Sequence, residues 1–436
     1  MQAAQAQSAP RNAALDQALH AIVTDAKKPL ASLSALAIRD GKVVYEGHFG
    51  RRVIDVTGAG KDIAPDTETL YRIASVSKLV TAIGAMRLVD EGRLDLDADV
   101  SRYLGFEMRN PNFPKAPIST RMLLNHTSSL RDDAGYFWGL DVRLQDVLTP
   151  GGKLFGKGGV WADTRATTSL EPGKFFHYVN LNYGVLGTVI EAITQERFDL
   201  YMKRAVLQPL AIKGGFTPEG LSQDDVNHTA VLYRKGQDGA WNSGGPWVPQ
   251  TDNFQGKLPA ERAGLAAYVP GANATGFGPQ GGLRISVRGL ARILQMLMNG
   301  GELDGLRLLQ SASITAMQSR EWNYADNPAN GDTLEGAFYA WGLGLQRFTD
   351  RSEMGKGDRL VAAGGLTGFG HLGFAYGLQS MLFYDPVRRL GLIYAIGGTG
   401  VDPELNKGQY SSFYAWEESI VDSLYRLALI EQKKGL

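Results

Sequence analysis

The segment Ser75-Val76-Ser77-Lys78 constrains this chain more than any other, because it opens an apolar pattern with the period of a helix. The next apolar positions are Leu79, Val80, Ile83 and Met86, which predict an amphipathic helix from near Ala74 to just before Gly92. Positions three apart share one face of a helix, so the side chains of Ser75 and Lys78 are predicted to meet.

A serine and a lysine in contact at a helix start suit nucleophilic catalysis. A serine hydroxyl needs a base within hydrogen-bond reach, and a desolvated lysine that has lost its proton can be that base. The first turn of a helix also leaves backbone N–H groups free to face developing negative charge. The same spacing arises by chance in surface helices, so the hypothesis depends on the other segments.

Two further segments carry candidate site residues. Tyr178-Val179-Asn180 follows a turn and precedes a helical pattern, so a phenol near a cation is predicted to relay protons and Asn180 to position the substrate. His371-Leu372-Gly373 lies in a glycine-rich strand whose edge suits a substrate, with the N–H of Phe374 as a second oxyanion donor beside that of Ser75. The alternatives are a core tyrosine and a partly buried histidine.

Composition excludes several classes of function. Of 436 residues, 44% are hydrophobic, and 45 Lys and Arg balance 45 Asp and Glu, so nucleic acid is not an expected partner. No apolar run is long enough to span a bilayer. There is no cysteine, the six histidines are scattered, and no G-x-S-x-G elbow occurs, so we expect no cofactor, no metal and no α/β-hydrolase.

The remaining pattern predicts helices and strands in separate blocks. Helices are expected at residues 13–27, 180–206, 286–298 and 411–430. Strands are expected at residues 33–38, 42–49, 341–345, 370–374, 378–384 and 390–395, the first two joined by the hairpin signal Asp40-Gly41. Residues 106–175 and 213–280 show little periodicity, which favours long loops.

The motifs together resemble the serine β-lactamase and D,D-peptidase superfamily. Ser75-x-x-Lys78, Tyr178-x-Asn180 and His371-x-Gly373 occur in its order, and Tyr71 to Lys78, Leu123 to Ser128, Pro172 to Gly187 and Gly281 to Ser286 resemble its flanking segments. The likeness is nearest to the branch of class C β-lactamases, D-aminopeptidases or amidases, and family VIII carboxylesterases.

The resemblance implies an α+β fold of the β-lactamase/transpeptidase type, with an antiparallel sheet flanked by helices and a mostly helical subdomain. We expect residues 12–100 and 335–434 to form a discontinuous α/β subdomain and residues 101–334 a mainly helical one with long loops. The catalytic cleft lies between them, and residues 1–11 form a flexible N-terminus. These first residues are similar to a signal cleavage site, which favours a periplasmic or secreted protein over a cytoplasmic one.

The roles implied for the site residues are those of a serine hydrolase that works through an acyl-enzyme. Ser75 is the expected nucleophile, Lys78 and Tyr178 the coupled base system, and Asn180, His371, Gly373 and Phe374 the substrate and oxyanion contacts. His371 stands where many relatives carry the lysine of Lys-Thr-Gly. Small esters, amides or peptides are therefore the expected substrates of a carboxylesterase or D-stereospecific amidase. A β-lactamase or D,D-carboxypeptidase, an acyltransferase and a non-catalytic binding protein are the alternatives.

Overall fold

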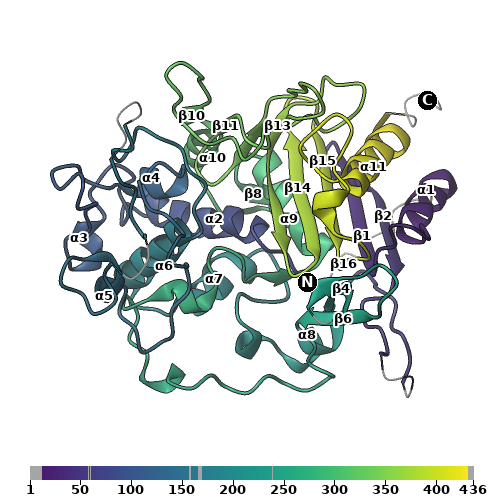
Figure 1. The fold of residues 1–436 in the computed structure, drawn as a ribbon, viewed down its shortest axis with the longest axis horizontal. Helices are drawn as coiled ribbons and strands as arrows, with labels where there is room; N and C mark the ends of the chain where they lie inside the picture. The colour runs from purple at the N-terminus through teal and green to yellow at the C-terminus, as the bar shows by residue number, and fades with distance from the viewer. Residues whose placement is uncertain are drawn as a thin grey trace.

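The computed structural model describes residues 12–56, 58, 60–156, 159–164, 169–237 and 239–430. The predicted flexible N-terminus, residues 1–11, lies outside these ranges. Eight strands form one antiparallel sheet at the centre of the molecule (Figure 1). In spatial order they are β10 (Trp322–Asn323), β11 (Ala340–Trp341), β12 (Gln346–Phe348), β13 (Gly368–Ala375), β14 (Leu378–Asp385), β15 (Leu390–Ile396), β1 (Ser32–Arg39) and β2 (Lys42–Gly50).

The sheet is buried on both faces, and the alternation of side chains along β1 shows how. Leu33, Ala35 and Ala37 point into the core beneath α1 (Ala13–Val23) and α11 (Ala415–Ser423). Leu36 and Ile38 point into the larger core on the opposite face, beneath α2 (Val76–Asp90) and α9 (Val287–Met298). Figure 1 shows α1 and α11 on one side of the sheet and α9 on the other. Helix α2, which starts beside Ser75, is thus held between the sheet and the helical part of the chain.

The middle of the chain packs against the far side of α2. Its core helix is α6 (Leu181–Thr194), which contacts α2, α3, α4 and α7. The shorter helices are α3 (Ser101–Leu104), α4 (Thr120–Leu124), α5 (Leu144–Leu148), α7 (Phe198–Met202), α8 (Gln223–His228) and α10 (Ser311–Gln318). Among the described residues no helix is long and apolar enough to cross a membrane.

Small strands complete the fold. β3 (Tyr71–Arg72) pairs with β7 (Arg284–Ile285), which brings the chain before Ser75 beside residues 280–283. β4 (Leu232–Gln237) joins β5 (Ala240–Trp241), β6 (Trp247–Thr251) and β16 (Gly398–Thr399) in a second sheet, and β8 (Glu302–Leu303) pairs with β9 (Leu306–Arg307). Residues 213–280 are therefore more ordered than their weak periodicity indicated.

Several predicted boundaries are wrong for local reasons. Of the expected strand 341–345 only Trp341 lies in a strand, at the end of β11. Residues 342–345 form the turn to β12, because Gly344 adopts φ 74° and Gly342 N–H bonds to Leu345 O. The helix expected to reach residue 27 ends at Val23, after which the Asp25 side chain accepts from two backbone N–H groups. The sheet also begins with β10, upstream of the boundary expected at residue 335. The division into two subdomains stays a prediction.

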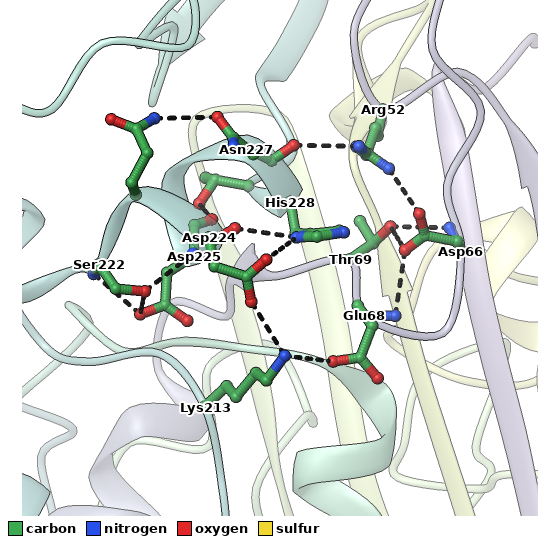
Figure 2. A network of polar contacts seen from close by, with 12 residues as sticks. Arg52, Asp66, Glu68, Thr69, Lys213, Ser222, Asp224, Asp225, Asn227 and His228 are labelled. Atoms are coloured by element: carbon green, nitrogen blue, oxygen red, sulfur yellow. Dashed lines mark hydrogen bonds and ion pairs between the residues drawn. The ribbon is translucent and has the colours of Figure 1, made fainter.

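A polar network anchors the chain just before it enters the site (Figure 2). Arg52 pairs with Asp66 at 2.8 Å and donates to Asn227 O at 3.0 Å, while Lys213 pairs with Glu68 at 3.1 Å. These contacts join residues 66–69 to α8. Each exposed pair contributes about 0–1 kcal/mol, so the network sets position more than stability.

Candidate active site

Ser75 and Lys78 meet at the start of α2 as the helical spacing predicted. Ser75 is the N-cap residue, and the Lys78 Nζ lies 2.9 Å from its Oγ. Two other acceptors surround the same nitrogen, the Asn180 Oδ1 at 2.7 Å and the Gln280 carbonyl oxygen at 3.0 Å. Ala74 adopts φ 48°, a left-handed conformation that costs a non-glycine residue energy and turns the chain sharply into the helix. The lysine is therefore held by three oxygens and aimed at one hydroxyl.

Lys78 is buried completely, and burial lowers its pKa from an ordinary 10.5 to about 7. The charge of Asp132 opposes this shift, but among the described residues no carboxylate forms an ion pair with Lys78. Near neutral pH a large share of the amine is thus unprotonated. Its lone pair can then accept the proton of the Ser75 hydroxyl, which is the requirement for a base.

Tyr178, from the second segment, lies beside Ser75 as predicted, but in a different protonation state from the one expected. Burial raises the pKa of Tyr178, and its hydrogen bond to Ser75 opposes the rise. The Lys78 Nζ lies 4.8 Å from the centre of the tyrosine ring. The expectation that a nearby cation makes this phenol acidic is wrong in the resting site, because burial raises the pKa of Tyr178 more than its hydrogen bond to Ser75 lowers it. The phenol is neutral and suited to donating a proton.

Asp132 is a site residue that the sequence motifs did not reveal. Its carboxylate accepts from Asn180 N–H at 2.8 Å, from Asn180 Nδ2 at 2.9 Å and from Leu181 N–H at 2.9 Å. It caps the start of α6 and turns the Asn180 carbonyl toward Lys78. The Asn180 Oδ1 thus accepts from Lys78 and one Nδ2 hydrogen is donated to Asp132, which leaves the second Nδ2 hydrogen for a substrate.

Gly373 brings strand β13 against the nucleophile. A Cβ at this position would lie closer than 3.0 Å to both Ile73 O and Ser380 Oγ and 3.2 Å from Ser75 N. β12 pairs with β13 only as far as Gly370, so the same edge from residue 371 to 375 has no strand partner among the described residues. The side chain of Phe374 is 53% exposed over the cavity. A role of its N–H as an oxyanion donor stays a prediction.

His371 lies behind the cavity wall, so its predicted contact with the substrate stays a prediction that the structure does not support. The residue is 1% exposed, does not line the cavity, and packs behind Tyr178 against Trp341, with ring centres 5.4 Å apart. Its Nδ1 donates to Leu372 O at 2.6 Å. Burial and the charge of Lys78 lower the pKa of His371 to about 3, so the imidazole is neutral. It supplies no positive charge where the Lys-Thr-Gly lysine would.

A second buried histidine, His126, packs against Tyr178. His126 adopts φ 60°, and its Nδ1 accepts from Val179 N–H at 3.1 Å. Its ring lies 4.5 Å from the ring of Tyr178, centre to centre. Burial lowers the pKa of His126 well below its usual range. The segment 123–128 quoted for the family resemblance thus supplies the surface on which Tyr178 rests.

One large cavity opens over these groups. Its volume is about 1060 Å³, enough for a drug-sized molecule, and Ser75, Tyr178 and Asn180 lie in its wall. The other walls are formed by residues 135–137, 280–281, 334–338, 372–376 and 404–417. Several exposed aromatic side chains gather there, including Tyr136, Phe137, Phe374 and Tyr376. No group of three or more potential metal ligands occurs among the described residues.

Comparison with known proteins places the geometry in context. Residues 15–410 match the family model described as Beta-lactamase. Protein flp of Staphylococcus aureus (strain N315) is 30% identical over 212 residues, which is 48% of this chain and 38% of that protein. A putative D-alanyl-D-alanine carboxypeptidase of Salmonella enteritidis PT4 (strain P125109) is 24% identical over 306 residues, 65% of this chain and 64% of that protein. These matches thus span less than two thirds of either relative.

A solved structure extends the likeness to almost the whole chain. The D-amino acid amidase from Ochrobactrum anthropi SV3, complexed with L-phenylalanine amide, has a TM-score of 0.65 at 19% identity and covers 97% of this chain and 100% of its own. The comparisons confirm the predicted α+β fold of the β-lactamase/transpeptidase type.

Proposed function

This chain belongs to the Beta-lactamase family of serine hydrolases, and on that premise we propose that it cleaves esters or amides of small molecules through an acyl-enzyme on Ser75. The observation that carries the proposal is the buried Lys78 Nζ, 2.9 Å from the Ser75 Oγ with a pKa of about 7. An ordinary surface pair of Ser and Lys offers neither the contact nor the neutral amine.

Acylation follows from these contacts. The Ser75 hydroxyl gives its proton to neutral Lys78, and its oxygen forms a bond to the substrate carbonyl carbon. The carbonyl oxygen becomes an oxyanion that the N–H groups of Ser75 and Phe374 stabilise, each donor being worth about 10²–10³ in rate. The new ammonium keeps its bonds to Asn180 Oδ1 and Gln280 O, so its charge forms in a prepared site.

Collapse of this intermediate needs a proton for the leaving group. The neutral phenol of Tyr178 donates that proton, the bond to the leaving alcohol or amine breaks, and Lys78 returns its extra proton to the phenolate. A water molecule then attacks the acyl-enzyme by the same steps and restores the Ser75 hydroxyl. An alcohol or amine in place of this water would make the enzyme an acyltransferase.

The substrate class follows from the charges around the nucleophile. A β-lactam or D,D-peptide carries a carboxylate, and the buried neutral imidazole of His371 offers it no cation. Esters and amides without a carboxylate at that point of the strand fit better, as for a carboxylesterase or D-stereospecific amidase. Turnover of p-nitrophenyl butyrate, D-phenylalanine amide and a chromogenic cephalosporin, measured side by side, separates these activities from a penicillin-recognising enzyme.

Loss of the nucleophile tests the proposal. Ser75→Ala is expected to fold normally, to lose p-nitrophenyl ester turnover and to gain no mass from a fluorophosphonate. Ser77→Ala is the matched control, because the Ser77 hydroxyl is buried and accepts from Leu283 N–H at 3.1 Å, away from the site. An adduct that forms equally on Ser75→Ala contradicts the proposal. A wild-type protein that forms no adduct would instead support a non-catalytic binding role.

A further inference from the structure

Arg72 is a cation in the wall of the active-site cavity that the proposed mechanism does not use. It lies in β3, three residues before the nucleophile, and its side chain lines the cavity. Its Nε donates to Gly281 O at 3.3 Å, and its guanidinium carbon lies 4.6 Å from the ring centre of Tyr376. The guanidinium is thus fixed at the rim between residues 280–281 and the end of β13.

This charge is only partly compensated within the protein, by the attraction of Asp252 and a hydrogen bond to the Tyr376 side chain. Among the described residues no carboxylate forms an ion pair with Arg72, and the nearby Arg284 repels it. The nearby Asp252 carboxylate accepts hydrogen bonds of 3.2 and 2.7 Å from the Arg284 guanidinium and forms an ion pair with it. Lys407, another cation of the cavity wall, does have a partner in Glu404 at 2.9 Å. A partly buried cation without a counter-ion costs free energy that an anionic ligand would recover.

The groups beside Arg72 are hydrogen-bond donors. Tyr136 and Tyr376 also line the cavity, interact electrostatically with each other, are 40% and 47% exposed, and each carries a phenolic hydroxyl. Burial raises the pKa of Tyr136, and the positive charge of Arg72 opposes this rise. A guanidinium flanked by two phenols matches the oxygens of a carboxylate, which accepts several hydrogen bonds at once.

We propose that Arg72, Tyr136 and Tyr376 form a subsite for a carboxylate of the substrate, so that this enzyme prefers anionic esters or amides. The inference rests on the proposed hydrolase function and specifies its substrates. The subsite is distinct from the position of His371, because Tyr376 lies in the turn that follows β13, and the strand runs four residues, about 13 Å, from His371 to its end at Ala375. Gly373, beside Ser75, is two residues, about 7 Å, from the same end of the strand, so the carboxylate lies several bonds from the reacting carbonyl.

Matched pairs of activated esters test this preference on the wild-type enzyme. On the acyl side, mono-p-nitrophenyl succinate, adipate and suberate are compared with the same esters capped as methyl esters. On the leaving-group side, 3-(4-acetoxyphenyl)propionate is compared with its methyl ester. In at least one arm, kcat/KM is expected to be about tenfold to hundredfold higher for the anion, with adipate or suberate above succinate on the acyl side. The preference should shrink as salt is added.

Substitution then assigns the preference to Arg72. Arg72→Gln is expected to abolish it while capped esters are still hydrolysed, and Arg72→Lys to retain part of it. Lys407→Gln is the control for a cavity cation that already has a partner, and the ratio of anionic to capped turnover should not change. Equal turnover of anionic and capped esters by the wild type in both arms overturns the inference, as does a preference that survives Arg72→Gln. A protein inactive on every ester refutes the proposed hydrolase function instead.

Discussion

The neutral state of Lys78 has a consequence for stability that can be measured without any substrate. Burial lowers the pKa of this lysine to about 7 in the folded protein, whereas 10.5 is its ordinary value in an unfolded chain. Between these two values the unfolded state binds more protons than the folded state. Stability must therefore rise with pH across this window, and the contribution is absent below pH 7, where both states carry the proton.

The size of the effect follows from the two pKa values. Integrated from pH 7 to pH 9.5, Lys78 contributes about 3 kcal/mol of additional stability. Lys78→Met keeps most of the volume of the side chain and removes the titrating group. The variant should gain stability relative to wild type at pH 7, and this advantage should fall by about 3 kcal/mol by pH 9.5.

Urea denaturation of both proteins at a series of pH values measures the difference. Lys115→Met, which removes an exposed lysine, is the control for the loss of a lysine as such. Because other groups titrate equally in wild type and variant, their contributions cancel in the comparison. A difference between wild type and Lys78→Met that stays constant from pH 7 to pH 9.5 would refute the reasoning, since Lys78 would then keep its charge in the folded protein.

Three other substitutions give separate tests. Gly373→Ala should lower kcat/KM about 100-fold with little change in Tm, because a Cβ there displaces β13 from Ser75. Gly281→Ala is the control and should be tolerated, because a Cβ at that position meets no atom closer than 3.7 Å. Asp132→Asn should lower the free energy of unfolding by about 1–3 kcal/mol, because it weakens the hydrogen bonds at the start of α6. It should also shift the acidic limb of the pH–rate profile to lower pH, because the Asp132 charge raises the pKa of Lys78. An unchanged acidic limb argues against this coupling. His371→Lys should lower the free energy of unfolding by about 3–5 kcal/mol without creating cephalosporin hydrolysis, because it places an unpaired cation in a buried position beside Tyr178. Efficient hydrolysis would contradict the placement of His371.

Local spacing was sufficient to predict the parts of the site that depend on local geometry. Ser75 and Lys78 meet because residues three apart on any helix meet. The hairpin of β1 and β2 followed from Asp40-Gly41 between two apolar runs. Tyr178 lies about a hundred positions away from Ser75, and no periodicity relates such distant segments, so its role was predicted from the chemistry of a phenol and then from the family resemblance.

The sequence-based predictions failed where burial, or a contact with a distant segment of the chain, determines the position of a side chain. The sequence placed His371 on the correct strand, but its side chain faces the core behind Tyr178, and a short glycine-rich strand has no alternation that indicates which face is buried. Asp132 follows an irregular segment, and only the folded chain brings its carboxylate to the start of α6. In the sequence Arg72 is an ordinary strand residue, and only the structure shows that its side chain lines the cavity.

The pH dependence of acylation shows whether the neutral form of Lys78 activates Ser75. The rate at which a fluorophosphonate forms its adduct is followed by intact mass over pH 5–10, with the adduct mapped to a residue. We expect an adduct on Ser75 whose rate is half-maximal near pH 7, as the neutral form of Lys78 appears. An adduct on another residue, or a rate that reaches half its maximum only near pH 10, would contradict it.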